Sequence, residues 1–332
     1  MKSFIKPTAY ALACAFLVAA GALVTAQDAL AWKPSKPVDF VIMAGKGGGA
    51  DKMARLMQTI IEKHKISPMP FIPINKPGGS GAESLIFLKN AKGISRDHTV
   101  MVTLNSFYTT PLRQPGLGVD ISKYTPIGRM AEDTFLLWVH KDSGINDVAG
   151  FVKAARAKGK SWIMAGTGKG QEDQLLTSFL NSAYSLNMTY VPFKGGGRVA
   201  KELAGKHADS TVNNPSEQLG FYQAGTTRPL AAFTPSRLPM FPDAPTFKEL
   251  GQGDKIPVYF MQRSVVGAPG MSKKAQKFYQ GVFKKVWQTD EWQKYMRKKS
   301  LQGEFLSGKG LMSYWMKERD NHREILKQIG EI

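Results

Sequence analysis

Apolar residues along this chain recur with two different spacings that alternate. Residues 38–43 form an apolar run typical of a buried strand, and in residues 51–63 apolar side chains return every third or fourth position, as in an amphipathic helix. A short apolar run at 71–74, a helical pattern at 82–90 and a further strand pattern at 99–104 follow. Strands that alternate with helices predict an α/β sheet with crossover helices.

The same alternation begins again in the second third of the chain, which predicts a second α/β unit. Near the C-terminus the pattern becomes purely helical, amphipathic and basic, and it predicts a helical cover over residues 273–299 and 311–329. The elements expected in the second unit are strands at 135–139, 161–164, 190–193 and 230–233, with helices at 148–157 and around 175–180.

Glycine-rich segments follow several of the predicted strands, at 45–50, 77–81 and 166–170. At the start of a helix the backbone N–H groups lack partners and the helix dipole is positive, so a glycine turn there can bind an anion. Lysines stand in or beside these turns and another at 194–197; they are Lys46, Lys76, Lys169 and Lys194. One such turn would be explained by chain reversal alone, but three at strand ends favour a carboxylate or phosphate site.

Other binding and catalytic motifs are incomplete. Residues 45–50 match the dinucleotide fingerprint, but Asn75 stands where the ribose-binding acid belongs, and no Gly-Lys-Ser/Thr follows any of the glycine turns. The histidines lack metal-ligand spacing, and there is no Gly-x-Ser-x-Gly motif, so we predict no cofactor, no metal and no enzyme. The adjacent Glu172 and Asp173 fit helix capping at least as well as chemistry.

The N-terminus has the features of an export signal. Lys2 and Lys6 precede an apolar run at 9–26, and an Ala-Leu-Ala sequence ends at Ala31. This order predicts a signal peptide cleaved after Ala31 and a periplasmic protein, with a retained membrane anchor as the alternative. Lipidation of Cys14 is a weaker alternative, because an alanine stands three positions before it.

The composition limits the kinds of partner that the exported chain can bind. The 332 residues include 45 Lys and Arg against 26 Asp and Glu, a formal charge of +19, and the length fits two domains. Cleavage removes two lysines and one aspartate, which lowers the charge by one, and it removes the single cysteine. The mature chain therefore has no disulfide, and export excludes nucleic acid as the target of its positive charge.

Several segments together resemble the tripartite tricarboxylate transporter substrate-binding proteins, also called the Bug or TctC family. The hallmarks are Lys-Pro-Val-Asp-Phe-Val-Ile at 36–42, Gly-Gly-Gly-Ala-Asp at 47–51 with Ala-Arg at 54–55, Asn-Lys-Pro-Gly-Gly-Ser-Gly-Ala at 75–82, an altered Arg-Asp-His-Thr at 96–99, Val-Pro-Phe-Lys-Gly at 191–195, Pro-Asp-Ala-Pro-Thr at 242–246 and Gly-Ala-Pro-Gly at 267–270. These segments keep the family's order and spacing from about Lys36 to the C-terminus.

The resemblance implies an α/β periplasmic binding protein of type II, in which two lobes close over a ligand like a Venus flytrap. Lobe one would comprise 32–132 and 257–332, and lobe two 133–256, so that the chain crosses the hinge twice. The ligand would be a small carboxylate, with di- and tricarboxylates favoured, and membrane permease subunits would receive it from a monomeric protein. The positions carried over are Gly47, Gly48, Gly49, Ala50, Asp51, Gly78, Gly79, Ser80 and Gly81 in lobe one, and Thr167, Gly168, Gln171, Lys194, Gly195 and Asn213, with Asn214, in lobe two.

Departures from the family occur where ligand specificity is expected. Gln171 and Gln174 replace a serine and a histidine, Phe193 replaces a tyrosine, and Arg263 replaces a tryptophan. Arg263 is either a contact for a distal carboxylate or a solvated surface residue, and the sequence leaves both open.

Two other functions remain open at this stage. The first is a ligand sensor for a signalling partner. The second is a secreted enzyme, which would need two of Asp51, Asp173 and His98 to converge in the cleft.

Overall fold

The computed structural model describes residues 32–332 of the chain, so the predicted signal peptide and its cleavage site lie outside the described residues. Both sheets and the candidate site belong to one compact unit, Pro34–Ile332. Within the described part, no helix is long and apolar enough to cross a membrane.

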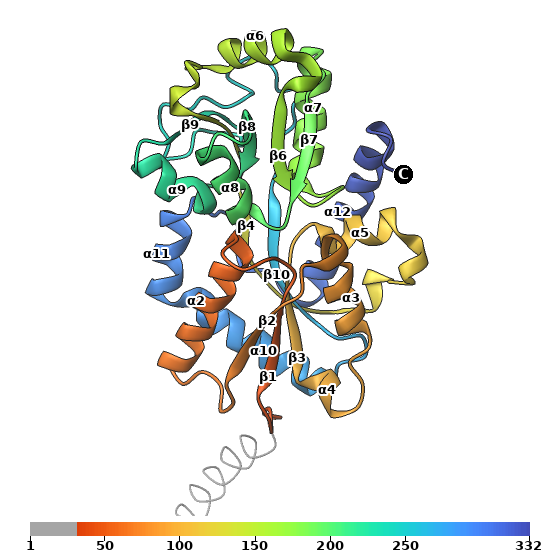
Figure 1. The fold of residues 1–332 in the computed structure, drawn as a ribbon. Coiled ribbons are helices and arrows are strands. Elements are labelled where there is room, and N and C mark those ends of the chain that lie inside the picture. Colours follow the sequence, from red (N-terminus) through yellow and green to blue (C-terminus); the bar gives the residue numbers. More distant parts are fainter. Residues whose placement is uncertain (1–31) are drawn as a thin grey trace, which may run out of the picture. The chain divides into compact units, whose positions relative to one another are not determined.

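The first sheet has five strands in the order β2-β1-β3-β10-β4. β1 (Val38–Ile42) is parallel to β2 (Phe71–Asn75) and β3 (Thr99–Thr103), whereas β10 (Met261–Gly267) is antiparallel to β3 and to β4 (Thr125–Asp133). Between the parallel strands the chain forms α2 (Gly49–Lys63), α3 (Ala82–Lys89) and α4 (Ile94–Asp97), and α5 (Ser106–Arg113) follows β3 (Figure 1).

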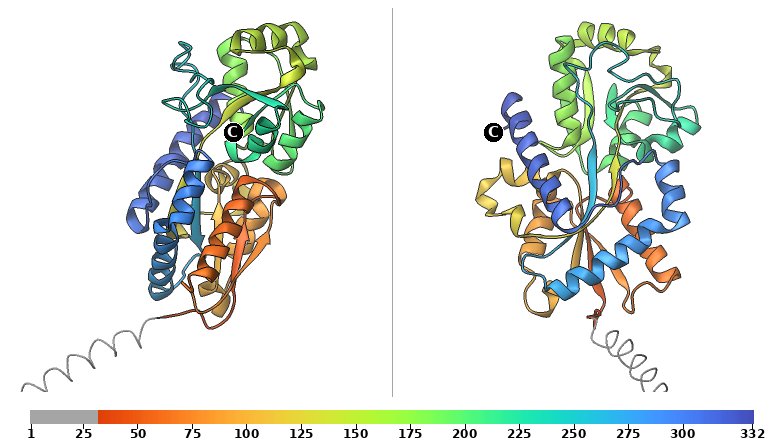
Figure 2. Two further views of the ribbon diagram at one scale, coloured as in Figure 1. Left: turned by 90° about the vertical axis from the view of Figure 1, so that its left-hand side faces the viewer. Right: turned by 180° about the vertical axis from the view of Figure 1, so that it is seen from behind.

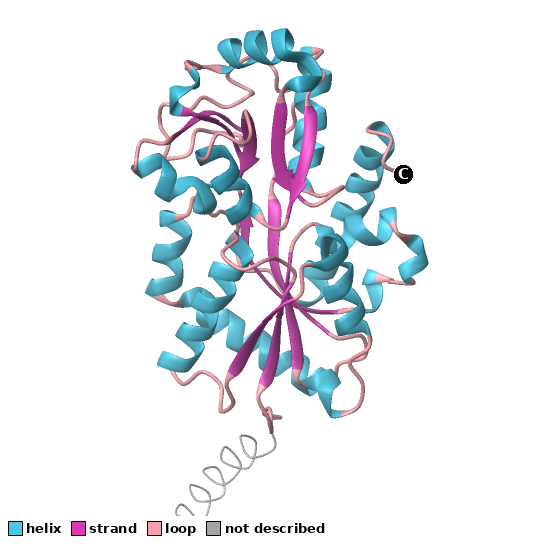
Figure 3. Cartoon of the chain, in the orientation of Figure 1, coloured by secondary structure: helices cyan, strands magenta, loops and turns pink. Residues whose placement is uncertain are grey.

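The second sheet repeats this plan in the order β7-β6-β8-β5-β9. β6 (Ile163–Thr167) is parallel to β7 (Thr189–Phe193) and β8 (Ser210–Asn213), and β5 (Leu136–His140) is antiparallel to β8 and β9 (Thr227–Ala232). Its helices are α6 (Val148–Lys158), α7 (Glu172–Tyr184), α8 (Gly196–Ala204) and α9 (Pro215–Gln223). Figure 3 shows the two groups of strands, each with its own helices, and the α/β two-lobed fold class predicted from sequence is confirmed.

The chain passes between the two sheets twice. β4 ends at Asp133 in the first sheet and β5 begins at Leu136 in the second; the return occurs between Ala232 at the end of β9 and Met261 at the start of β10. β10 then inserts between β3 and β4, so the returning strand completes the first sheet.

The C-terminal helices pack through aromatic side chains, α10 (Lys273–Gln288) on the first sheet and α12 (Gly308–Gln328) on α5. Phe40 and Phe71 meet edge to face at 5.5 Å between ring centroids, and Phe283 of α10 lies within 6 Å of both rings. On α12, Trp315 lies 4.8 Å from the Phe107 ring. Figure 2 shows α10 lying across the sheet in the view from behind.

Two element boundaries differ from the sequence expectation for clear reasons. The helix predicted over 273–299 is two helices, because the Thr289 side chain accepts a hydrogen bond from Trp292 N and so starts α11 (Asp290–Lys298). The strand predicted at 161–164 is β6, which begins at Ile163 and includes Gly166. A Cβ on Gly166 would collide with the Tyr190 ring and with Asp173. This glycine therefore serves the close approach of a helix and a neighbouring strand rather than a loop.

Candidate ligand-binding site

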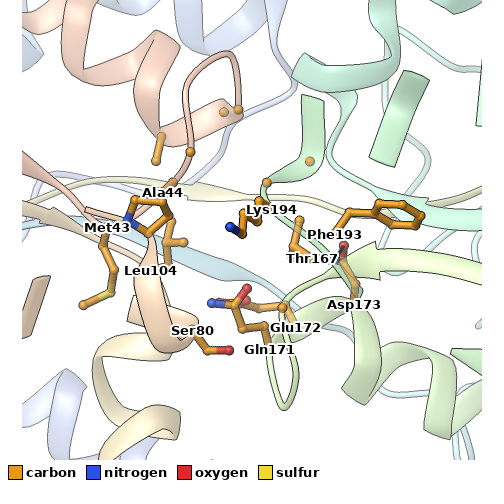
Figure 4. Close-up of a pocket in the computed structure, with 18 of the residues that line it drawn as sticks. Met43, Ala44, Ser80, Leu104, Thr167, Gln171, Glu172, Asp173, Phe193 and Lys194 are labelled. Atoms are coloured by element: carbon orange, nitrogen blue, oxygen red, sulfur yellow. Dashed lines mark hydrogen bonds between the residues drawn. The ribbon is translucent and has the colours of Figure 1, made fainter. Parts of the chain in front are cut away.

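A cavity of about 340 Å³ lies where the glycine turns of the two sheets meet. Its lining comes from the turns after β1 and β2 in the first sheet and from those after β6, β7 and β8 in the second, with β10 contributing Met261 and Arg263 (Figure 4). A ligand crevice outside the carboxyl ends of parallel strands is the usual place in open α/β sheets. Apolar contacts come from Met43, Leu104 and Phe193.

The turn after β1 lines the cavity with its backbone, whereas its acidic residue, Asp51, does not line the cavity. Gly48 is the N-cap of α2, and no side chain caps this helix from within. The Asp51 carboxylate accepts hydrogen bonds from Gly47 N at 2.9 Å and from Arg55 Nε and Asn75 Nδ2 at 3.0 Å. Asp51 therefore fixes the turn, while Gly48, Gly49 and Ala50 line the cavity.

The turn after β2 depends on left-handed backbone. Gly79, Ser80 and Gly81 have φ of +60°, +56° and +94°, a region that glycine adopts without strain. Ser80 is held in it from both sides, because its hydroxyl donates to Lys169 O at 3.0 Å and its carbonyl accepts from Thr110 Oγ1 at 2.6 Å. Gly78, Gly79 and Ser80 line the cavity, whereas Gly81 packs on Met43.

The second sheet supplies the polar side chains that are free to meet a ligand. Gln171 is 8% exposed and lines the cavity, and its side-chain amide bonds to no other described residue. Lys194 also lines the cavity, and no carboxylate in the described part of the chain lies within ion-pair distance of it. In Figure 4 both side chains point toward the middle of the pocket.

Four carboxyl groups that the sequence did not assign to the site also line the cavity, namely Glu83, Glu172, Asp173 and Glu217. Glu172 accepts a hydrogen bond from Asn105 N at 2.9 Å, and Asp173 accepts one from Thr167 N at 2.8 Å. Burial raises the pKa of Glu172 and raises that of Asp173 well above its usual range. Both residues cap backbone outside their own helix, so capping is the role that their contacts support.

Arg263 is buried beneath the cavity. It is 2% exposed; Nε donates to Asp133 Oδ2 at 3.0 Å, Nη2 donates to the same oxygen, and Nη2 also donates to Asn214 Oδ1 at 3.2 Å. The interpretation of Arg263 as a solvated surface residue is therefore wrong. Its guanidinium borders the cavity, but Asp133 already compensates its charge.

The family model described as "Tripartite tricarboxylate transporter family receptor" matches residues 54–330 of this chain. The chain belongs to this receptor family. A curated relative, "UPF0065 protein in tcbD-tcbE intergenic region" of Pseudomonas sp. (strain P51), is 24% identical over 65% of this chain. The match spans 63% of that relative's length, slightly under two thirds.

Solved structures of similar fold support the two-lobed architecture. "Structure of periplasmic binding protein BugD" superposes with a TM-score of 0.81 at 19% identity, covering 90% of this chain and 98% of the other. "R. palustris Rpa4515 with adipate" superposes with a TM-score of 0.79 at 22% identity, covering 90% and 98%.

The receptor's cavity contains most of the sixteen ligand-binding candidates, namely Arg263 and the fifteen positions carried over from the family resemblance, with Asn214 counted separately. Twelve of the sixteen line it: Gly48, Gly49, Ala50, Gly78, Gly79, Ser80, Thr167, Gly168, Gln171, Lys194, Gly195 and Arg263. The four that do not line it are Gly47, Asp51, Gly81 and Asn213. Asn214, which follows Asn213 in the chain, does line it. Asn213 instead donates from Nδ2 to Glu217 Oε2 at 2.8 Å.

The turns of the receptor's two lobes touch beside the cavity. A Cβ on Gly45 would lie 3.0 Å from Lys194 O, and one on Gly197 would lie 2.9 Å from Gly47 O. Only glycine permits backbones to approach this closely, so the turns after β1 and β7 are fitted to a closed arrangement.

The three residues considered for an enzyme have separate partners. Asp51 and Asp173 hold the turns described above, and His98 Nδ1 donates to Ile94 O at 2.7 Å. Among residues 32–332 no hydrogen bond joins any two of them, and no three His, Cys, Asp or Glu side chains are grouped to hold a metal ion.

Proposed function

We propose that this protein is a periplasmic solute-binding protein that captures a small organic carboxylate between two lobes and delivers it to a tripartite tricarboxylate transporter. The observation that carries the proposal is the cavity itself, where glycine turns from both lobes and the N-terminus of α2 meet beside Lys194. Such turns bind anions through unpaired N–H groups and the positive end of a helix. The function involves no catalytic step.

We assign the ligand contacts to groups of the cavity lining that have no hydrogen-bond or ion-pair partner within the described chain. The ammonium of Lys194 and the side-chain amide of Gln171 have no partners in the described part of the chain, and they meet the ligand from lobe two. Gly79 and Ser80 contribute backbone from lobe one. The adipate named for the R. palustris protein of similar fold is a ligand of the chemical class that we propose.

The proposal also covers the location of the protein in the cell and the bounds of its two lobes. Residues 1–31 direct export and are removed after Ala31, so the mature protein works as a monomer in the periplasm and meets the membrane subunits of the transporter there. Lobe one comprises 32–132 and 257–332, and lobe two comprises 133–256. Ligand binding stabilises the closed arrangement of the two lobes, and the transporter recognises that arrangement.

Calorimetric titration and thermal melting with a panel of mono-, di- and tricarboxylates test this function. We expect at least one acid to bind and to raise the melting temperature, since a ligand that binds only the folded state stabilises it. If no organic acid binds and none shifts the melting temperature, the proposal is wrong.

A substitution in the turn after β1 tests the site. At Gly48 a Cβ has its nearest neighbour 3.5 Å away and the backbone φ is −75°, so Gly48→Val fits the fold but places methyl groups beside the cavity. We expect at least tenfold weaker binding with little change in melting temperature. Gly116→Val is the control, because a Cβ there meets nothing within 4 Å and the position does not line the cavity. Equal affinity of the two variants would contradict the assignment of this turn.

A further inference from the structure

The carboxylate of Glu217 spans the two lobes at the edge of the cavity. Glu217 lies in the first turn of α9, and its Oε1 accepts a hydrogen bond from Gly49 N at 3.1 Å. Its Oε2 accepts from Asn213 Nδ2 at 2.8 Å and from Asn214 N at 3.4 Å. The side chain is thus held in place by its own lobe while it bonds to the other one.

Gly49 is the first residue of α2, the helix whose positive end faces the cavity. Its N–H is one of those that have no partner within the helix, and a carboxylate ligand would bind at that position. Glu217 therefore occupies a place suited to a ligand carboxylate. The position is also shaped for it, because a Cβ on Gly196 would overlap the Glu217 carboxyl group.

The other charges around the cavity leave little to attract a second negative group. Glu83 accepts from Gly78 N at 3.1 Å, so it occupies part of the turn after β2 in the same way, and Asp133 neutralises Arg263. After burial, the charge of Glu217 is the next cause that raises the pKa of Asp173, so these two carboxyl groups of the lining already repel each other. Within the described chain, Lys194 is the one cation of the lining without an ion pair.

We propose that Glu217 selects against a second carboxylate, so that the preferred ligand carries one carboxylate and ends, toward Glu217, in a neutral group that donates hydrogen bonds, such as an amide. This proposal rests on the proposed function and specifies its ligand class. Lys194 and the glycine turns balance the single carboxylate, and Glu217 accepts hydrogen bonds from the opposite end. A diacid would place like charges close together in a partly buried site, where their repulsion is weakly screened.

The test uses pairs of ligands that differ in charge but hardly in shape. Adipate and its half-amide, 6-amino-6-oxohexanoate, are titrated into the full mature chain by calorimetry at constant ionic strength, and a pair on any other carbon skeleton found by the acid panel follows. Wild type is compared with Glu217→Gln, which keeps the shape, and with Glu217→Ala, which removes the group. Glu249→Gln is the charge-matched control, since Glu249 pairs with Arg237 at the surface and does not line the cavity. The melting temperature of each variant shows whether it is folded.

We expect wild type and Glu249→Gln to bind the half-amide at least tenfold more tightly than the diacid. In both Glu217 variants that ratio should fall at least tenfold, mainly because the diacid gains affinity. If wild type binds the diacid as tightly as the half-amide, the proposal is wrong but the proposed function stands. The same holds if the preference for the half-amide is unchanged in both Glu217 variants. Absence of binding by every acid and half-amide would overturn both.

Discussion

Replacing Arg263 should lower the free energy of unfolding, whichever ligand the protein binds. Arg263→Met leaves Asp133, also 2% exposed, without its partner in the interior. Breaking a buried ion pair by removing one member costs about 3–5 kcal/mol, because the remaining charge is neither solvated nor compensated. We therefore expect the free energy of unfolding, measured by urea titration followed by circular dichroism, to fall by about this amount.

The double variant Arg263→Met with Asp133→Asn distinguishes ion pairing from lost packing. With the carboxylate also removed, about 2 kcal/mol or more of stability should return, since replacing both partners of a buried pair is often nearly neutral. Arg237→Met is the matched control: Arg237 pairs with Glu249 at the surface, with both side chains nearly half exposed, and its loss should cost about 1 kcal/mol or less. A loss below about 1 kcal/mol in Arg263→Met would refute the reasoning and return Arg263 to the role of a ligand contact.

Two further predictions concern groups away from the cavity. Burial lowers the pKa of His322 to about 4; protonation therefore opposes folding, and stability should be full above about pH 6.5 and fall by about 3 kcal/mol as the pH drops to 4. Urea midpoints against pH measure this, and the same slope in His322→Gln would exclude His322 as its source. Glu331 accepts hydrogen bonds from Arg113 at 3.0 and 2.6 Å and from Gln174 at 2.8 Å, so it ties the C-terminus to both lobes. Glu331→Ala should weaken ligand binding by about three- to tenfold, because closure loses about 1 kcal/mol of contacts; an unchanged affinity in calorimetry would contradict this role.

The glycine turns could be predicted because their information is local. A strand pattern, a glycine run and a helix pattern in sequence define a turn at a sheet edge, and no distant residue is needed to recognise it. The cavity accordingly includes Gly48, Gly79 and Gly168, all expected from sequence. Gly166 is an exception, since its role depends on Tyr190, which approaches from the neighbouring strand.

Two carboxylates of the cavity, Glu217 and Glu172, could not be predicted because their partners are distant in sequence. Glu217 meets Gly49 across 168 positions, and Glu172 meets Asn105 across 67. Arg263 and Asp133 meet because β10 lies antiparallel beside β4, and neither of these strands was predicted. A capping residue in sequence looks the same whether it caps its own helix or one in the other lobe, and only the fold distinguishes the two.

The net charge of the chain is therefore a poor guide to its ligand. The lysines of α10 lie on its solvent face, and none of them lines the cavity; they are Lys273, Lys274, Lys277, Lys284 and Lys285. Their field extends over only about one Debye length, roughly 8 Å at physiological salt, so it assists encounter more than selection. Selection depends on the few groups that a ligand touches. The lining combines two cations, Lys194 and the paired Arg263, with four carboxyl groups. A strongly basic protein can thus contain a cavity that accepts a single negative charge and rejects a second.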